Sequence, residues 1–261
     1  MTALPIQWTR NGLAVGRSEI PALQIEAFRE ACVAAVTAGY RLSAMTVLPA
    51  SPGTVGVTGA PGAPRAAGAA REDSILAVIA DDAESRIGFL QGTVPDSRRY
   101  QSLSIDLPQA QAFEREILED HKIVPEGHPW PKPLRRHADL EPGKKTAVGA
   151  AHVHPFFRVE GAGVHEVAVG PVHAGIIEPG HFRFQCQGEK VLHLETQLGY
   201  QHRGAEALFL KSAHARRLVV AESLAGDTAL GHALAYCAAM EGLSRTEAPL
   251  AAQAPRGLAR E

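Results

Sequence analysis

The pattern of apolar and polar positions predicts a sheet with two helices in the first half of the chain. Four segments alternate or stay apolar for about the length of a strand: residues 41–48, 74–80, 86–91 and 99–107. Two segments repeat apolar residues at helical spacing: residues 22–38, ended by Gly39, and residues 109–119, with Phe113 and Ile117 on one face. This half is therefore expected to form an α+β layer.

Turn and cap residues give further predictions for the first half of the chain. Asn11-Gly12 predicts a short hairpin within residues 4–15, and Ser18 with Pro21 predicts the start of the first helix. Residues 50–70 are rich in Gly, Ala, Pro and Ser, which predicts a mobile loop at a hairpin tip.

The second half predicts a hairpin followed by helices. Residues 181–186 and 190–196 alternate on either side of a turn at Gln187-Gly188-Glu189, as in a β-hairpin. A connection rich in Pro and Gly precedes it, with a short strand expected near residues 156–159. Helices are expected over residues 206–214, 217–223 and 230–243. Polar groups gather at the hairpin ends, where loops present them to a ligand.

Composition excludes several classes of protein. The chain has 261 residues, 45% of them hydrophobic and 21% charged, with a net charge of -2. This balance is typical of a globular protein and argues against a nucleic-acid surface. Cys32, Cys186 and Cys237 are far apart in the sequence and show no metal or redox spacing, which indicates a reducing cytosol. No apolar run is long enough to span a bilayer.

Several short motifs occur in an order that resembles one protein family. They are Gly170-Pro171-Val172-His173, Glu178-Pro179-Gly180-His181, His202-Arg203-Gly204-Ala205-Glu206, and Gly226-Asp227 with His232. In this order they resemble the start of the large subunit of formate-hydrogenlyase-type (group 4) nickel–iron hydrogenases. They also resemble the close relative of that large subunit in the respiratory NADH:quinone oxidoreductase, its forty-nine-kilodalton subunit.

A second set of motifs lies upstream and resembles another part of the same respiratory complex. Glu114-Arg115-Glu116, Glu126-Gly127-His128-Pro129 and Leu134-Arg135 are similar to the end of its thirty-kilodalton subunit. In the hydrogenase relatives the two modules are fused in this order. Read from the residues alone, the same motifs could also be a solvated helix face followed by a proline turn.

The resemblance implies an α+β fold in two modules. Residues 1–136 would form an α/β sandwich like that of the thirty-kilodalton subunit, and residues 137–163 a linker. Residues 164–261 would form the N-terminal β-hairpin and helices of a module like the hydrogenase large subunit or the forty-nine-kilodalton subunit. In the family a long helical bundle follows, and this chain stops where the bundle would begin. The resemblance therefore implies a truncated or split subunit, with a separate C-terminal half as one expected partner.

The nickel-binding relatives hold their metal with Cys-x-x-Cys pairs, of which the first belongs to this module. Here the matching positions read Ala225-Gly226-Asp227-Thr228, and His232 keeps the place of a following histidine. Nickel–iron centres need soft thiolate ligands, which alanine and threonine do not supply. We therefore expect no metal and no cofactor bound by this chain alone.

The resemblance also implies the site residues. In the respiratory relative the old metal cavity has become the quinone-headgroup end of a chamber, so a quinone is expected at a subunit interface. His173 is the first candidate for contacting its carbonyl, with His181 as the alternative, and His202 and Arg203 complete the quinone-binding set. Glu178 falls where hydrogenases carry a proton-transferring glutamate, and Asp227 is placed to hydrogen-bond His173 or His232. Structurally, His202 and Arg203 could simply tie the hairpin to the next helix, and His232 could be an ordinary core histidine.

Two functions follow from this resemblance. The first is a subunit of a membrane-associated redox complex that transfers electrons to a quinone or takes part in coupled proton transfer, and that shows no turnover alone. Its partners would be membrane-arm subunits and an iron–sulfur subunit, which carries the clusters and is of the small-hydrogenase type or its respiratory counterpart. These partners would hold the chain peripherally on the cytoplasmic face of the cell membrane. The alternative is a non-catalytic scaffold that only assembles such a complex.

Overall fold

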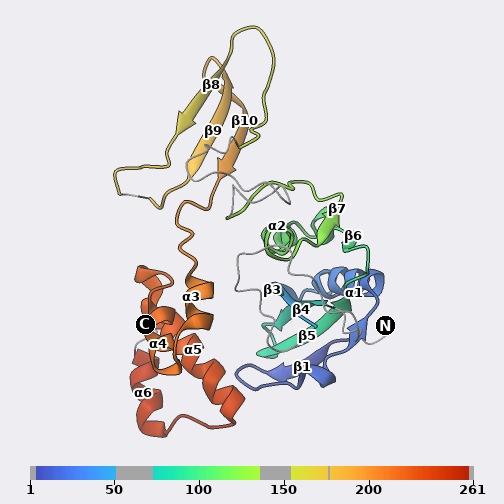
Figure 1. The fold of residues 1–261 in the computed structure, drawn as a ribbon, viewed down its shortest axis with the longest axis vertical. Helices are drawn as coiled ribbons and strands as arrows, with labels where there is room; N and C mark the ends of the chain where they lie inside the picture. The colour runs from blue at the N-terminus through green and yellow to red at the C-terminus, as the bar shows by residue number, and fades with distance from the viewer. Residues whose placement is uncertain (1–3, 51–72, 136–153, 176, 259–261) are drawn as a thin grey trace.

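The computed structural model describes residues 4–50, 73–135, 154–175 and 177–258. The architecture is α+β and has three parts along the chain. A three-stranded sheet lies at one end of the long axis, and the N-terminal sheet and the C-terminal helices lie beside each other toward the other end (Figure 1). Residues 51–70 of the predicted loop, and residues 137–153 of the linker predicted at residues 137–163, lie outside the described residues.

The N-terminal part is a mixed five-stranded sheet. The strands are β1 (Gln7–Arg10), β2 (Ala22–Leu23), β3 (Arg41–Leu48), β4 (Ser74–Asp81) and β5 (Arg86–Thr93). Their order is β1-β5-β4-β3, with β2 pairing in parallel to β5. Strand β4 is the apolar run of the sequence. Most of its residues are buried, as expected for a central strand with antiparallel neighbours on both sides.

Helix α1 (Ile25–Thr37) covers this sheet and supplies much of its core. Phe28 is fully buried, and its ring lies directly over Gly92 of β5. A Cβ at Gly92 would come within 2.6 Å of that ring, so the close approach of helix and sheet requires glycine there. The helical spacing of apolar residues in the sequence therefore correctly predicted which face of α1 packs in the core.

A second helix, α2 (Gln111–His121), joins the N-terminal part to the rest of the chain. It follows β6 (Arg99–Gln101) and two short 3₁₀ turns, η2 (Leu103–Ile105) and η3 (Pro108–Ala110). After α2, strand β7 (Val124–Glu126) pairs in parallel with β6. Ile117 is buried and Phe113 packs against the core, as predicted.

The second sheet contains β8 (Val164–Val169), β9 (His181–Gln187) and β10 (Lys190–Gln197), all antiparallel, with β9 in the centre. Its hairpin β9–β10 was predicted, whereas β8 was not. The helices that follow are α3 (Ala205–Lys211), α4 (His214–Glu222), the 3₁₀ turn η4 (Gly226–Thr228), α5 (Ala229–Ser244) and α6 (Leu250–Leu258). Gly242 of α5 lies against the turn at Gly12, where a Cβ would be 2.4 Å from the Gly12 carbonyl oxygen. No helix in the described ranges has the length and apolar character needed to cross a bilayer.

Four local predictions are wrong. Asn11-Gly12 forms no hairpin, because β1 pairs with the distant β5. The first helix begins at Ile25, after a 3₁₀ turn η1 (Arg17–Glu19) and β2, so Ser18 is not its cap. The strand predicted at residues 99–107 ends at Gln101, since a 3₁₀ turn follows. Residues 156–159 form no strand, because the Phe157 N–H bonds to a buried carboxylate instead.

Candidate functional site

The loop between β8 and β9 is closed at its neck by two histidines. Nε2 of His173 lies 2.7 Å from the carbonyl oxygen of Gly180, and Nδ1 of His181 lies 3.0 Å from the carbonyl oxygen of Gly170. Each histidine thus bonds the backbone at the opposite side of the neck. The two motifs that the sequence singled out are brought together here.

Glycine is required at position 170 for this closure. Its backbone has a φ of +77°, a conformation that disfavours residues with a Cβ. A Cβ there would lie 2.2 Å from the Gly180 oxygen and 2.4 Å from Nε2 of His173. The ring of His173 is therefore packed against backbone on one side, and its centroid lies 5.7 Å from that of the Phe182 ring.

Arg183 holds His181 from the other side. Its Nε–H donates to Nε2 of His181 at 3.2 Å, and its Nη1 pairs with Glu166 of β8. Its guanidinium carbon lies 4.4 Å from the centre of the Phe156 ring, within cation–π range. Hydrogen bonds from Gln185 and Arg183 keep the pKa of the exposed Glu166 carboxyl below its ordinary value. No sequence motif marked Arg183, because its contacts depend on the pairing between strands.

The other predicted residues are more open. The side chains of Glu178, His202 and Asp227 are exposed, and His232 on α5 is half-buried. Among the described residues, no hydrogen bond or ion pair joins Asp227 to His173 or His232, or joins the loop at residues 170–181 to residues 225–232.

Arg203 is held at the end of α4. Its Nη2 donates to the carbonyl oxygens of Ser223 and Leu224 at 2.5 and 3.2 Å. These carbonyls end the helix, where a cation is favoured by unpaired oxygens and by the helix dipole. The contact places Arg203 next to the turn that precedes Asp227.

The residues around that turn do not fit a nickel–iron centre. Ala225 supplies no donor, and Thr228 supplies only a neutral hydroxyl. The three cysteines of the sequence are free and lie on three separate elements, α1, β9 and α5. Burial raises the pKa of the Cys32 thiol to about 12, so this group stays protonated in the N-terminal core. The described residues therefore supply no pair of thiolates to hold the metal.

A buried carboxylate that sequence reasoning missed lies on β10. Glu195 is 1% exposed and accepts hydrogen bonds from Lys132 Nζ at 2.5 Å, His154 Nε2 at 2.9 Å and the Phe157 N–H at 2.8 Å. Burial alone raises the pKa of Glu195, and these donors outweigh burial, so the net pKa is lowered. The cluster fastens residues 132 and 154–157 to one face of the sheet.

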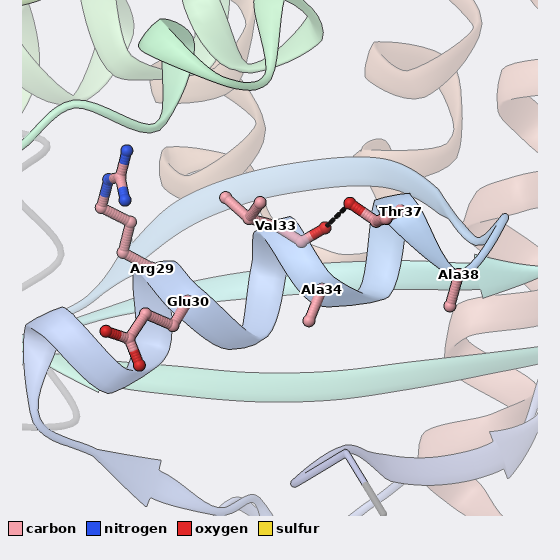
Figure 2. Close-up of a pocket in the computed structure, with 6 residues that line it drawn as sticks. All are labelled: Arg29, Glu30, Val33, Ala34, Thr37 and Ala38. Carbon is pink, nitrogen blue, oxygen red and sulfur yellow. Dashed lines mark hydrogen bonds between the residues drawn. The ribbon is translucent and has the colours of Figure 1, made fainter. Parts of the chain in front are cut away.

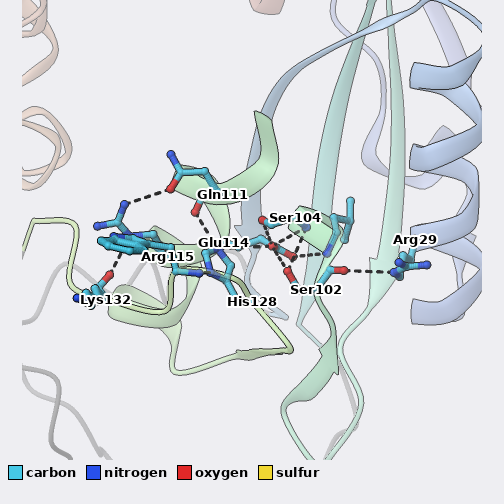
Figure 3. A network of polar contacts seen from close by, with 10 residues as sticks. Arg29, Ser102, Ser104, Gln111, Glu114, Arg115, His128 and Lys132 are labelled. Carbon is cyan, nitrogen blue, oxygen red and sulfur yellow. Dashed lines mark hydrogen bonds and ion pairs between the residues drawn. The ribbon is translucent and has the colours of Figure 1, made fainter. Parts of the chain in front are cut away.

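The acidic motif of α2 and the Gly-His-Pro turn after it form a second buried network (Figure 3). Glu114 is fully buried and accepts hydrogen bonds from the Ser102 hydroxyl at 2.6 Å, the Leu103 N–H at 2.8 Å, and the N–H and hydroxyl of Ser104. His128 lies next to it, with Nε2 donating to the Gln111 carbonyl at 3.2 Å. Burial lowers the pKa of His128. The motif is therefore an internal support, not a solvated face.

Residues 130–135, here called the strap, are held by α2. Arg115 donates to the carbonyl oxygens of Lys132 and Pro133 at 2.8 and 2.7 Å, and Glu119 accepts from the N–H groups of Leu134 and Arg135. Arg135 in turn pairs with acidic groups on two helices: Glu116 and Asp120 of α2, and Glu206 of α3. Because the guanidinium fills the space between these three carboxylates, they form an ion-pair network and not a cation site.

A hollow of about 410 Å³ follows the outer side of α1 (Figure 2), and Arg29 in its lining also donates to the Ser102 carbonyl oxygen beside the Glu114 network. Its described lining comes from this helix and the residue that follows it: Arg29, Glu30, Val33, Ala34, Thr37 and Ala38. The Thr37 hydroxyl is used within the helix, where it donates to the Val33 carbonyl at 2.8 Å. The hollow brings together no groups suited to catalysis, so we do not assign the site there.

Comparison with known proteins supports the hydrogenase part of the resemblance. No protein-family model matches the sequence. Hydrogenase-4 component G of Escherichia coli is 29% identical over 180 residues, which is 62% of this chain and 32% of that protein. Formate hydrogenlyase subunit 5 of the same bacterium is 27% identical over 174 residues, 61% of this chain and 31% of that protein. Membrane-bound hydrogenase subunit alpha of Pyrococcus furiosus is 27% identical over 84 residues, 32% of this chain and 20% of that protein.

The chain is similar to hydrogenase subunits. It spans less than a third of the length of each of these relatives. The similarity supports the predicted likeness to hydrogenase subunits, while NADH, quinone and the named partner subunits stay predictions. Residues 225–228 contain no cysteine.

Proposed function

We propose that this chain is a subunit of a membrane-associated hydrogenase-like redox complex and that it works without a nickel–iron site of its own. The proposal is carried by the donor set at residues 225–228, which the resemblance matches to the first Cys-x-x-Cys pair and which contains no thiol. The similarity to hydrogenase subunits supports the complex, and the residue types support the loss of the metal.

In this proposal the loop at residues 170–181 contacts a quinone-like acceptor at a subunit interface. Its support is the rigid neck, which fixes the ring of His173 by backbone contacts while Val172 beside it is 86% exposed. Electrons would arrive through iron–sulfur clusters of a partner subunit. Membrane-arm subunits, and a separate C-terminal large-subunit half, would complete the complex on the cytoplasmic side of the membrane.

Metal content tests the first element of the proposal. The purified chain, incubated with Ni²⁺ under reducing conditions and then desalted, is expected to retain far less than one nickel per chain by mass spectrometry of its metals. Its cysteines lie on separate elements and cannot supply paired thiolates. Stoichiometric nickel that survives desalting and is lost in the Cys237→Ser variant would overturn the proposal.

Activity of the intact complex tests the second element. The complex is purified through a tag on this chain, and reduction of a water-soluble quinone is measured with reduced ferredoxin or NADH as donor. His173→Ala and Glu178→Ala are expected to lower turnover at least ten-fold while the subunit composition is unchanged. His165→Ala is the matched control, because His165 is an exposed histidine on β8 of the same sheet.

The alternative function is a scaffold that only assembles the complex. It is favoured by the buried networks at Glu114 and Glu195, whose carboxylates are engaged in hydrogen bonds within the chain. For a scaffold, His173→Ala and Glu178→Ala would leave turnover unchanged, whereas disrupting α2 would release partner subunits. The same purification, followed by counting the subunits, separates the two functions.

A further inference from the structure

Both ring nitrogens of His128 are used, and their partners require the ring to be neutral. Nε2 lies 3.2 Å from the Gln111 carbonyl oxygen, which only accepts hydrogen bonds, so Nε2 carries a hydrogen. Nδ1 accepts the backbone N–H of Trp130 at 2.9 Å, so Nδ1 must present a lone pair. The residue is 6% exposed, and protein atoms rather than solvent supply both partners.

Two charged groups of α2 lie near the ring and act in opposite directions. The Glu114 carboxylate, with Oε2 3.9 Å from Nε2, favours a charged ring, whereas the Arg115 guanidinium disfavours it. Burial is the largest effect and disfavours the charged ring as well, so the net pKa of His128 is lowered. The folded chain therefore holds a histidine that resists protonation.

Charged groups on the neighbouring elements have partners of their own. Glu126 of β7 pairs with Arg99 of β6 at 2.6 Å. Asp106, at the end of η2, pairs with Arg29 of α1. These pairs keep the neutral ring of His128 as the form that fits its surroundings.

A second proton on His128 would break the contact with Trp130. Protonation places a hydrogen on Nδ1, so the Trp130 N–H would face a donor in place of an acceptor. The charged ring would also repel Arg115, whose guanidinium holds the carbonyl oxygens of Lys132 and Pro133. Both effects act on the first four residues of the strap.

Leu134 and Arg135, the last two residues of the strap, are held without His128. The Glu119 carboxylate accepts both of their backbone N–H groups. The Arg135 guanidinium also pairs with carboxylates of α2 and α3. A proton on His128 therefore leaves this end of the strap in place.

We propose that the contact between His128 Nδ1 and the Trp130 N–H, here called the latch, is a pH-sensitive switch that frees residues 130–133 when His128 takes up a proton. The freed segment carries Lys132, whose ammonium lies 4.4 Å from the centre of the Trp130 ring and pairs with Glu195 of β10. Opening the latch moves the ring away from that ammonium and loosens the link between α2 and the second sheet. The proposal does not depend on the proposed function, because it concerns a joint within the chain.

The direction of the pH effect follows from the two states of the latch. Burial lowers the pKa of His128 while the latch is closed, and the ring regains its ordinary pKa of about 6.5 when the latch opens. The open state therefore binds the proton more tightly. Opening becomes easier as the pH falls below the ordinary pKa, and the latch is fully effective above it.

Hydrogen exchange of the backbone amides of the full chain, followed by NMR at pH 7.5 and pH 5.0, tests the latch. After correction for the intrinsic exchange rates, protection of the Trp130 amide is expected to fall at least about five-fold at the lower pH. Protection of the Leu134 and Arg135 amides is expected to change less than about two-fold, because Glu119 still accepts them. Equal losses at both ends of the strap would overturn the proposal.

Two substitutions separate His128 from another histidine near the strap. In His128→Asn the side-chain oxygen replaces Nδ1 as the acceptor and does not titrate, so the pH effect on the Trp130 amide is expected to disappear. His121→Asn is the matched control, because His121 ends α2 and burial lowers its pKa too. This variant is expected to keep the full effect. Persistence of the effect in His128→Asn, or its loss in His121→Asn, would contradict the switch.

The imidazole nitrogen signals of His128 give a test that needs no substitution. In the wild-type chain at pH 7.5, labelled with ¹⁵N-histidine, the ring is expected as the Nε2–H tautomer. An Nδ1–H tautomer could not accept the Trp130 N–H, and observing it would rule out the latch even if His128→Asn failed to fold.

Discussion

The Glu114→Ala variant is expected to unfold with a free energy about 3–5 kcal/mol lower than the wild type, because a buried, fully bonded carboxylate is lost. Four donors would lose their acceptor: the hydroxyls of Ser102 and Ser104, and the N–H groups of Leu103 and Ser104. These groups are buried beneath α2, so water cannot replace the carboxylate without disturbing the core. Urea unfolding, followed by the circular dichroism of the helices, measures the change.

The control for this prediction is Glu126→Ala. Glu126 is also an ion-paired glutamate, with Oε1 2.6 Å from Nε of Arg99, but both side chains are about half exposed. Its loss is expected to cost less than about 1 kcal/mol, as is usual for surface pairs. Equal destabilisation by the two variants would contradict the internal-support role of Glu114.

The Glu195→Gln variant is expected to lose about 2–4 kcal/mol of stability near pH 7, because the buried carboxylate has three donors, one of which is the cation of Lys132. The pKa of Glu195 is lower in the folded chain than its ordinary value. A carboxyl whose pKa is depressed by folding contributes stability above its unfolded pKa, and this contribution is lost as the pH falls through the folded pKa. The gap between wild type and variant should therefore be full at pH 6–7 and shrink toward pH 3.

Thermal unfolding of both proteins at a series of pH values checks this trend. Glu189→Gln is the matched control, because Glu189 is an exposed glutamate in the turn of the same β9–β10 hairpin. It is expected to change the unfolding temperature little at any pH. A gap for Glu195→Gln that widens as the pH falls would show that the carboxylate is not held by its donors.

Local patterns in the sequence predicted the elements whose partners are close in the chain. Strands β3, β4 and β5, helices α1 and α2, and the β9–β10 hairpin all follow the period of their own residues. The wrong predictions fall where a side chain from a distant part of the sequence determines the backbone conformation. Glu114 binds the N–H groups of Leu103 and Ser104 and so turns a predicted strand into a 3₁₀ turn. Glu195 does the same to the strand predicted at residues 156–159.

The candidate site was predictable only in part, for the same reason. The motifs at His173 and His181 pointed to one loop, and the structure brings both histidines to its neck. Which histidine can meet a ligand depends on Arg183, whose contact arises from the register of β9 and has no motif of its own. Arg203 was a candidate ligand contact, and in the structure its guanidinium donates to the Ser223 carbonyl oxygen at the end of α4.

The strap joins parts of the molecule that share no core. Its backbone is fixed to α2 through Arg115 and Glu119, while its own cations reach outward, Lys132 to Glu195 of β10 and Arg135 to Glu206 of α3. A partner that rotated α2 by a few degrees would therefore displace the second sheet and the helical part together. The orientation of the loop at residues 170–181 would then depend on α2, although α2 contributes no residue to that loop.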